Sequence, residues 1–218
     1  MEYKNCKPLF NRLSKQKKDN ILMTSVAEFS RKGFSSANIN LIAEKSGISV
    51  GAMYKYFSSK RNLYLTCVEM SKEHLNSTMQ ALINDDDDFL VLVEKIIRAI
   101  QDHSRKNIEF TKMYYEMATE DNSEYAMVIS NVIEGATSDL YSSYISRTKK
   151  HDNLRKDIDP RFFAFFIDNL FMMLQFSYSC AYYQNRMKIY TYDDVFNNDD
   201  LVVSQMVDFI KGALYLKD

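Results

Sequence analysis

A short segment near the amino terminus constrains the fold of this chain more than any other part of its sequence. Ile39, Ile42 and Ala43 are spaced at i, i+3 and i+4, which predicts the buried face of a short helix. Gly47 follows where that helix must end, because glycine adopts a positive φ without steric cost. Ser49 can accept a hydrogen bond from an unpaired amide and so begin a second helix. The segment therefore predicts two short helices joined by a tight turn, which is a helix-turn-helix.

The second of these helices has the composition of a helix that enters the major groove of duplex DNA. Gly51 and Ala52 near its start permit a close backbone approach, and Tyr54, Lys55 and Tyr56 carry donors that suit phosphate oxygens. An ordinary helical hairpin that serves only packing is the alternative for this segment.

The flanking residues extend the pattern on both sides. Lys60 lies in the first turn of the next predicted helix, where free amides and a partial positive charge attract anions. Upstream, residues 21–34 predict an amphipathic helix that ends at Gly33 and packs its apolar face under the two short helices.

Together these residues resemble the DNA-binding domain of TetR-type transcriptional regulators. The positions that match in register are Gly33-Phe34, Ile42-Ala43, Gly47-Ile48-Ser49, Tyr54-Lys55-Tyr56-Phe57, Lys60 and Leu63. The chain departs from the family's pattern at Asn38, which is often threonine, and at Val50, which is often basic. Asn38 can still cap a helix and reach a phosphate, whereas Val50 offers only methyl groups to a thymine methyl. The resemblance leaves the operator sequence open.

The resemblance implies a set of residues that contact DNA. They are Asn38, Asn40, Ser49, Val50, Gly51, Ala52, Tyr54, Lys55, Tyr56 and Lys60. It also implies that two copies of the chain place their recognition helices on successive major grooves of a near-palindromic operator.

The distribution of charge supports a polyanionic partner for the first third of the chain. Residues 1–70 hold 12 Lys and Arg against 5 Asp and Glu, a net charge of +7. Residues 71–218 hold the remaining 16 Lys and Arg against 24 Asp and Glu, a net charge of −8. We therefore expect the first part to be attracted to DNA and the acidic remainder to face away from it. Lys15, Lys17 and Lys18 either touch the DNA backbone or form a solvated helix start.

Length and composition predict an all-α chain of two domains. Two prolines and five glycines in 218 residues leave long stretches without strand and turn signals. We predict a helix-turn-helix domain over residues 1–64 and a larger helical ligand-binding and dimerisation domain over residues 65–218. Three cysteines without metal-ligand spacing indicate a reducing compartment, with no disulfide framework and no metal site. With a polar amino terminus and no signal peptide, we expect a cytoplasmic protein.

The carboxy-terminal domain is predicted to contain five further helices. Their expected ranges are 89–104, 107–119, 124–149, 160–186 and 201–216. The acidic run at residues 85–88 is expected to be a solvated loop, with a calcium site as the alternative. The very apolar run from Phe162 to Phe176 includes Asp168, Asn169 and Gln175, so we interpret it as a buried helix and not as a membrane span.

Apolar side chains at 4,3 spacing mark the last two predicted helices. TetR-like proteins pair these helices with those of a second subunit, and by resemblance we assign the same role here. The residues expected at this homodimer interface are Phe166, Met173, Phe176, Val202, Met206, Phe209 and Ala213. The alternative is that these stripes serve only the core of one subunit.

The same domain is rich in Phe, Tyr and Met, which line adaptable apolar pockets. We expect a small, largely apolar effector, contacted by Met113, Tyr114, Met117, Asp168, Phe171, Met172, Gln175 and Tyr182. A buried carboxylate at position 168 beside aromatic rings would suit a lipophilic cation. The alternative is that the polar residues of this set form hydrogen bonds across the dimer interface or are exposed at its rim.

These features predict a ligand-responsive, dimeric transcriptional regulator, which in the TetR family is more often a repressor than an activator. No cofactor is expected. Catalysis is not expected either, because His74, His103 and His151 lie in no nucleophile or metal motif and no glycine-rich phosphate loop is present. The alternative function is a helical adaptor or regulator that responds to a protein partner without a small-molecule ligand.

Overall fold

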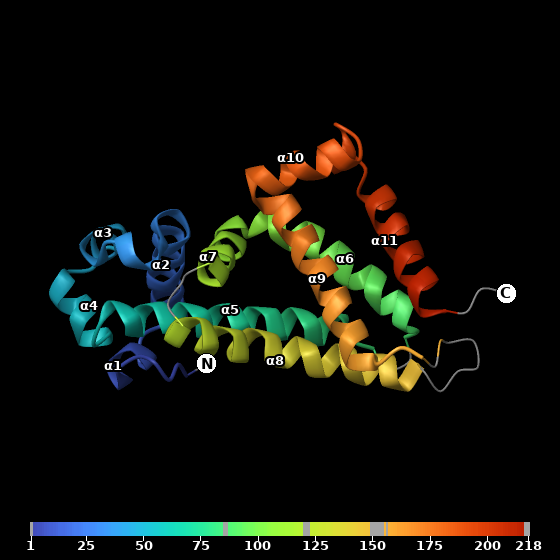
Figure 1. Ribbon diagram of the computed structural model, residues 1–218. Coiled ribbons are helices and arrows are strands. Elements are labelled where there is room, and N and C mark those ends of the chain that lie inside the picture. The colour runs from blue at the N-terminus through green and yellow to red at the C-terminus, as the bar shows by residue number, and fades with distance from the viewer. Residues whose placement is uncertain (1, 85–86, 120–122, 149–154, 156, 216–218) are drawn as a thin grey trace. The chain divides into compact units, whose positions relative to one another are not determined.

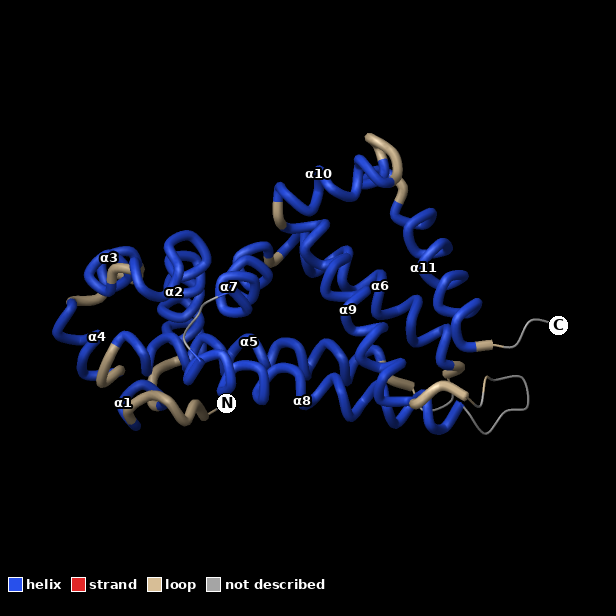
Figure 2. The backbone as a smooth tube through the Cα atoms, viewed as in Figure 1, coloured by secondary structure: helices blue, strands red, loops and turns tan. Residues whose placement is uncertain are grey.

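The computed structural model describes residues 2–84, 87–119, 123–148, 155 and 157–215, and these form eleven α-helices and one short 3-10 helix (Figures 1 and 2). The predicted all-α class is confirmed. The helices divide into two compact units, one of residues up to 75 with 109–132, the other of residues 76–108 with those from 133 onward. This division is by compactness and does not test the predicted boundary between domains after residue 64, which stays a prediction. Within the described ranges, no helix has the length and apolarity that a membrane crossing requires.

The first unit contains the predicted helix-turn-helix. Its helices are α1 (Pro8–Asn11), α2 (Lys15–Ser36), α3 (Ile39–Lys45), α4 (Val50–Tyr56), the first part of α5 (Lys60–Leu82), α7 (Ile108–Thr119) and the first part of α8 (Ser123–Thr148). Helix α2 begins earlier than predicted, because the Ser14 hydroxyl accepts a hydrogen bond from the Lys17 amide at 3.3 Å. Gly33, with φ 68° and ψ 171°, has a non-helical backbone, so the regular helix breaks there as predicted, and α2 continues to Ser36 only across this kink.

The core of this unit is aromatic and aliphatic, as the periodicity predicts. Ile42 and Ala43 are fully buried, and Phe57 is 1% exposed. The rings of Phe29 and Tyr64 pack edge to face with centroids 4.8 Å apart, which joins α2 to α5.

A buried carboxylate holds the corner between α2 and α3. Glu28 is 4% exposed, pairs with Arg31 at 2.7 Å, and accepts a hydrogen bond from the Asn38 amide at 3.4 Å. Burial alone would raise the pKa of Glu28, but the hydrogen bonds from Arg31 and Asn38 outweigh it and lower that pKa below its usual value. The corner is therefore held by a charged group that must stay ionised.

The second unit contains the last four helical elements of the chain. It comprises the remainder of α5 and α8, together with α6 (Phe89–Lys106), α9 (Pro160–Ser179), α10 (Ala181–Tyr190), the 3-10 helix η1 (Val195–Asn197) and α11 (Asp199–Leu214). Asp88 caps α6 by accepting a hydrogen bond from the Leu90 amide at 2.8 Å. Asp85 and Asp86 of the predicted acidic loop lie outside the described residues.

The prediction of one continuous helix over residues 160–186 is wrong. Cys180 has an extended backbone, φ −114° and ψ 125°, and separates α9 from α10. The hydroxyls of Ser177 and Ser179 donate to the carbonyls of Met173 and Gln175, one turn earlier, at 2.8 and 2.9 Å. Such hydroxyl–carbonyl bonds bend helices, and here two of them fall just before the break.

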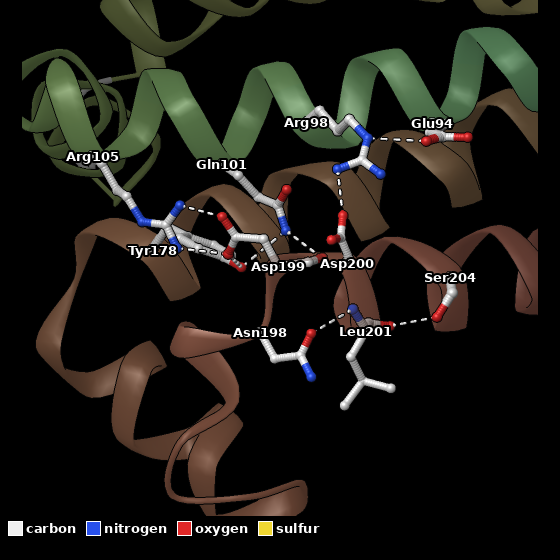
Figure 3. Close-up of polar contacts among 10 residues, drawn as sticks. All are labelled: Glu94, Arg98, Gln101, Arg105, Tyr178, Asn198, Asp199, Asp200, Leu201 and Ser204. Carbon is white, nitrogen blue, oxygen red and sulfur yellow. Dashed lines mark hydrogen bonds and ion pairs between the residues drawn. The ribbon is translucent and has the colours of Figure 1, made fainter.

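A polar network ties the start of α11 to α6 and α9 (Figure 3). Arg105 binds the Asp199 carboxylate through both terminal nitrogens, with the second contact at 2.6 Å. The Tyr178 hydroxyl donates to the same carboxylate at 2.9 Å and accepts from Gln101 at 3.0 Å. The guanidinium of Arg105 also lies 4.6 Å from the centroid of the Tyr178 ring.

The protonation behaviour of this network follows from its contacts. Burial and the hydrogen bond to Asp199 raise the pKa of Tyr178 to about 12, while the hydrogen bond from Arg105 lowers the pKa of Asp199. Near neutral pH the tyrosine therefore stays a donor and the aspartate an acceptor, so the network keeps its polarity.

We predict that Glu28→Gln lowers the free energy of unfolding by about 1–3 kcal/mol at neutral pH, because a charge-assisted hydrogen bond is lost from a buried site. The pKa of Glu28 is lower in the folded chain than in the unfolded one, so its contribution is complete above the unfolded value of about 4.3. That contribution disappears as the pH falls through the folded pKa. Urea unfolding of both proteins at stepwise lower pH measures this, and a stability gap that persists unchanged into strong acid would contradict it.

We predict that Asp199→Asn lowers the free energy of unfolding by about 1–3 kcal/mol, because Arg105 and Tyr178 lose their common anionic acceptor. Asp200→Asn is the matched control, since Asp200 is 84% exposed and pairs with exposed Arg98, and an ion pair in water contributes little to stability. Chemical unfolding followed by circular dichroism compares the two. Equal losses would show that the network does not stabilise α11.

Candidate nucleic-acid interface

Both short helices of the helix-turn-helix begin on a side-chain cap. The Asn38 side-chain oxygen accepts from the amides of Asn40 and Leu41, at 2.9 and 3.5 Å, at the start of α3. The Ser49 hydroxyl accepts from the Ala52 amide at 3.1 Å at the start of α4. Between them, Gly47 has φ 68°. The predicted turn and both caps are confirmed, and they fix the orientation of α4 with local hydrogen bonds.

Helix α4 has one face in the core and one in solvent. Met53 is 1% exposed and anchors the inner face. On the outer face, Val50 is 37% and Tyr54 is 48% exposed, and Lys55 is exposed as well. A Cβ added at Gly51 would meet only the Ser49 hydroxyl, at 3.9 Å, so packing inside the unit does not require glycine there. The outer face is therefore accessible to a partner that approaches the backbone closely.

Besides the capping residues Asn38 and Ser49, two more of the predicted DNA contacts have partners inside the unit. Tyr56 is 8% exposed, and its ring lies 5.9 Å from that of Phe10. Lys60 donates from its ammonium group to the carbonyls of Ser35 and Ala37, at 2.8 and 3.3 Å, at the end of α2. The structure thus gives Tyr56 a packing role and Lys60 a capping role, and their contacts with DNA stay predictions.

The amino-terminal segment packs against α4, a contact that was not predicted from the sequence. Lys7 contacts two carbonyls of α4, and Phe10 is fully buried beneath it. The available signal was Pro8, which suits the first turn of a helix, followed by the apolar pair Leu9 and Phe10. The partners of these residues lie far away in sequence, so local patterns gave no indication of them.

The candidate ligand residues fall in different units. Met113 and Tyr114 lie on α7 in the first unit, whereas Asp168, Phe171, Met172 and Gln175 lie on α9 in the second. The side chain of Met117 lies outside the described residues. Tyr182 lies beyond the break at Cys180, on α10, and is 73% exposed. The predicted common face of Asp168 and Tyr182 on one helix is therefore wrong.

Asp168 has an unusual environment within the second unit. Its side chain is half-buried and makes no hydrogen bond in the part of the chain that the structure describes. Burial and the negative charge of Glu134 raise its pKa to about 6. Tyr141 of α8 is 4% exposed, and its ring packs edge to face on that of Phe171 at 5.8 Å. Burial and the charges of Asp168 and Glu134 also raise the pKa of Tyr141.

The candidate dimer residues divide between surface and core. Phe166 on α9 and Phe209 on α11 are 57% and 65% exposed, whereas Phe176 and Val202 are buried inside the unit. The side chains of Met173, Met206 and Ala213 are half-buried. Phe162 and Phe165 extend the exposed aromatic surface along α9, and Phe165 was not predicted.

Across the described ranges, no cluster of three or more His, Cys, Asp and Glu side chains could bind a metal ion. The geometry assembled in the first unit is instead that of a capped, surface-exposed helix on an aromatic core. Its exposed face carries polar and small side chains, which are residue types that can contact phosphates and admit a nearby backbone.

Comparison with known proteins agrees with this geometry. Residues 21–67 match the family described as bacterial regulatory proteins, tetR family. An uncharacterized HTH-type transcriptional regulator of Bacillus subtilis, YerO, is 37% identical over 73 residues, which cover 34% of this chain and 24% of YerO. The chain spans between about a quarter and a half of the length of the first curated relatives it matches.

Solved structures share the fold over nearly the whole chain. A TetR family transcriptional regulator from Chloroflexus aurantiacus aligns with a TM-score of 0.71 and 16% identity, covering 97% of this chain and 99% of the other. SmeT in complex with triclosan aligns with a TM-score of 0.67 and 16% identity, covering 93% of each chain. SmeT is the repressor of the Stenotrophomonas maltophilia multidrug efflux pump SmeDEF. Residues 21–67, which carry the helix-turn-helix, thus match the tetR family, and the described helices share the fold of these solved TetR-type structures.

Proposed function

We propose that this protein is a DNA-binding transcriptional regulator that acts as a homodimer on a near-palindromic operator. The observation that carries the proposal is the accessible outer face of α4, where Val50, Tyr54 and Lys55 face solvent while Met53 anchors the opposite side. A recognition helix needs this combination of exposure and rigid support. The net charge of +7 over residues 1–70 supplies the attraction to phosphates that does not depend on sequence.

The exposed aromatic surface of the second unit supports the homodimer. Phe162, Phe165 and Phe166 on α9, and Phe209 on α11, are each more than half exposed. Aromatic side chains gathered on a surface mark an interaction site, because leaving them in water is costly. A second copy of the chain, paired through α9 and α11, would bury them and present two recognition helices about 34–36 Å apart.

We propose further that a small, largely apolar effector bound in the second unit releases the protein from DNA, so that it acts as a repressor. The structure of a fold relative, SmeT, with triclosan supports a ligand of this size. Helices α5 and α8 each run from one compact unit into the other, which gives ligand binding a mechanical route to the DNA-binding unit. Since both recognition helices must bind at once, a small change in their separation loses most of the joint affinity.

The environment of Asp168 supports an effector that carries a positive charge. A half-buried carboxylate without a hydrogen bond among the described residues is costly, and a cation would satisfy it. The neighbouring rings of Tyr141 and Phe171 would cover the apolar part of such a ligand.

We predict that the protein retards duplex DNA from the region upstream of its own gene, with an affinity that falls steeply as salt is added. Lys55→Ala should weaken binding about tenfold and reduce the salt slope by about 1, because one phosphate contact is lost. Lys106→Ala is the control, since Lys106 lies on α6 and pairs with Asp102. Electrophoretic mobility shift measures all three proteins. No retardation at low salt would reject DNA binding, and a salt-independent protein complex would favour the adaptor function.

We predict that tetraphenylphosphonium binds the second unit and that Asp168→Asn weakens its binding about tenfold or more, because the carboxylate contributes about 1.4 kcal/mol or more. The anion tetraphenylborate, of the same shape, should bind at least as weakly to the wild type as tetraphenylphosphonium does to the variant. Isothermal titration calorimetry measures each pair. Equal affinity of wild type and Asp168→Asn for the cation would contradict a charged effector and leave DNA binding untouched.

A further inference from the structure

The carboxyl end of α4 is capped by a residue from the amino-terminal segment. The last carbonyls of any helix lack partners within it, and in a helix as short as Val50–Tyr56 they are a large share of the total. The Lys7 amide donates to the Tyr56 carbonyl at 2.8 Å, and the Lys7 ammonium donates to the Tyr54 carbonyl at 2.8 Å. The Phe57 amide donates to the Met53 carbonyl at 2.9 Å. One lysine thus supplies two donors to the end of the recognition helix.

The charge of Lys7 suits this position. A positive charge near the carboxyl end of a helix interacts favourably with the partial negative charge of its exposed carbonyls. Helices of this length are marginal on their own, so their ends and their packing decide whether they are rigid. Helix α4 is therefore held at one end by Ser49 and at the other by Lys7.

The segment that carries Lys7 is itself anchored. Phe10 is fully buried and packs against Phe57, with ring centroids 4.7 Å apart. The Asn11 side chain makes two hydrogen bonds to the backbone of Tyr3, at 2.9 and 2.8 Å. Glu69 of α5 accepts from the Lys4 amide at 2.9 Å. These contacts fix the backbone of Lys7 and so limit how far its side chain can move.

We propose that the amino-terminal segment, residues 2–13, is a brace for the recognition helix, and that Lys7 is a positioning residue for DNA recognition. The brace holds α4 at the angle that the major groove requires, and Lys7 acts through the backbone of α4 and not through the DNA. This inference rests on the proposed DNA-binding function. The competing role for Lys7, which is exposed, is a direct contact with a DNA phosphate.

The experiment compares Lys7→Met, Lys7→Arg and the control Lys4→Met in the full-length protein. Lys4 lies in the same segment, and its exposed side chain makes no hydrogen bond or ion pair among the described residues, so its replacement removes the same charge without removing a bond to α4. DNA affinity is measured over a range of salt concentrations by mobility shift with the upstream DNA. Amide hydrogen exchange of the free proteins is measured alongside, with α2 as the internal reference.

The brace predicts a distinct set of results. Lys7→Met should lose about five- to tenfold in DNA affinity without a change in salt slope, and Lys7→Arg should restore binding because a guanidinium also donates to carbonyls. Lys4→Met should bind like the wild type. In the free protein, Lys7→Met should speed exchange of α4 amides while exchange in α2 stays unchanged.

Other outcomes would overturn the brace. A salt slope reduced by about 1 in Lys7→Met would identify a phosphate contact, and equal behaviour of Lys7→Met and Lys4→Met would show that only net charge matters. Unchanged α4 exchange in Lys7→Met would also reject the inference. The exchange measurement needs no DNA, so it still tests the brace if the wild type retards no duplex and the proposed function itself fails.

Discussion

Support of a short helix at both of its ends is the constraint on which the helix-turn-helix unit depends. Helix α4 is too short to be stable by its own hydrogen bonds, so its geometry comes from outside. Ser49 satisfies an amide at its start, Lys7 satisfies carbonyls at its end, and Met53 anchors it from below. These contacts lie at the two ends and on the inner face of α4, so the outer face remains accessible to a partner. Rigidity and accessibility of the same helix thus arise from one arrangement.

In the second unit, polar contacts hold the start of helix α11 beside helices that are largely apolar. Arg105 and Tyr178 converge on Asp199, so the first turn of α11 is fixed by charge and hydrogen bonding. Further along, α11 and α9 expose aromatic side chains such as Phe166 and Phe209. The polar network therefore positions the helix that carries part of the proposed dimer surface. We expect a substitution at Asp199 to change the position of that surface as well.

Local signals predicted the helix-turn-helix because its determinants are local. Gly47 and Ser49 act on neighbours within a few residues, and their roles follow from residue type alone. The contact of Lys7 with the Tyr54 carbonyl spans 47 residues, so no pattern of spacing could reveal it. The break at Cys180 carries neither glycine nor proline, which is why the sequence predicted a continuous helix there. Spacing along α9 also did not predict burial. Phe176 is buried, whereas Phe166, which belongs to the same row of apolar residues at 4,3 spacing, is exposed.

The raised pKa of Asp168 has an energetic consequence for the protein without a ligand. A carboxyl that holds its proton more tightly in the folded chain than in the unfolded chain stabilises the fold in acid, and that contribution is lost as the pH rises through about 6. At neutral pH the ionised group is therefore a liability to the folded chain. A bound cation would remove the cost of burying the ionised Asp168 carboxylate, so the melting temperature of the protein would rise as the site is filled.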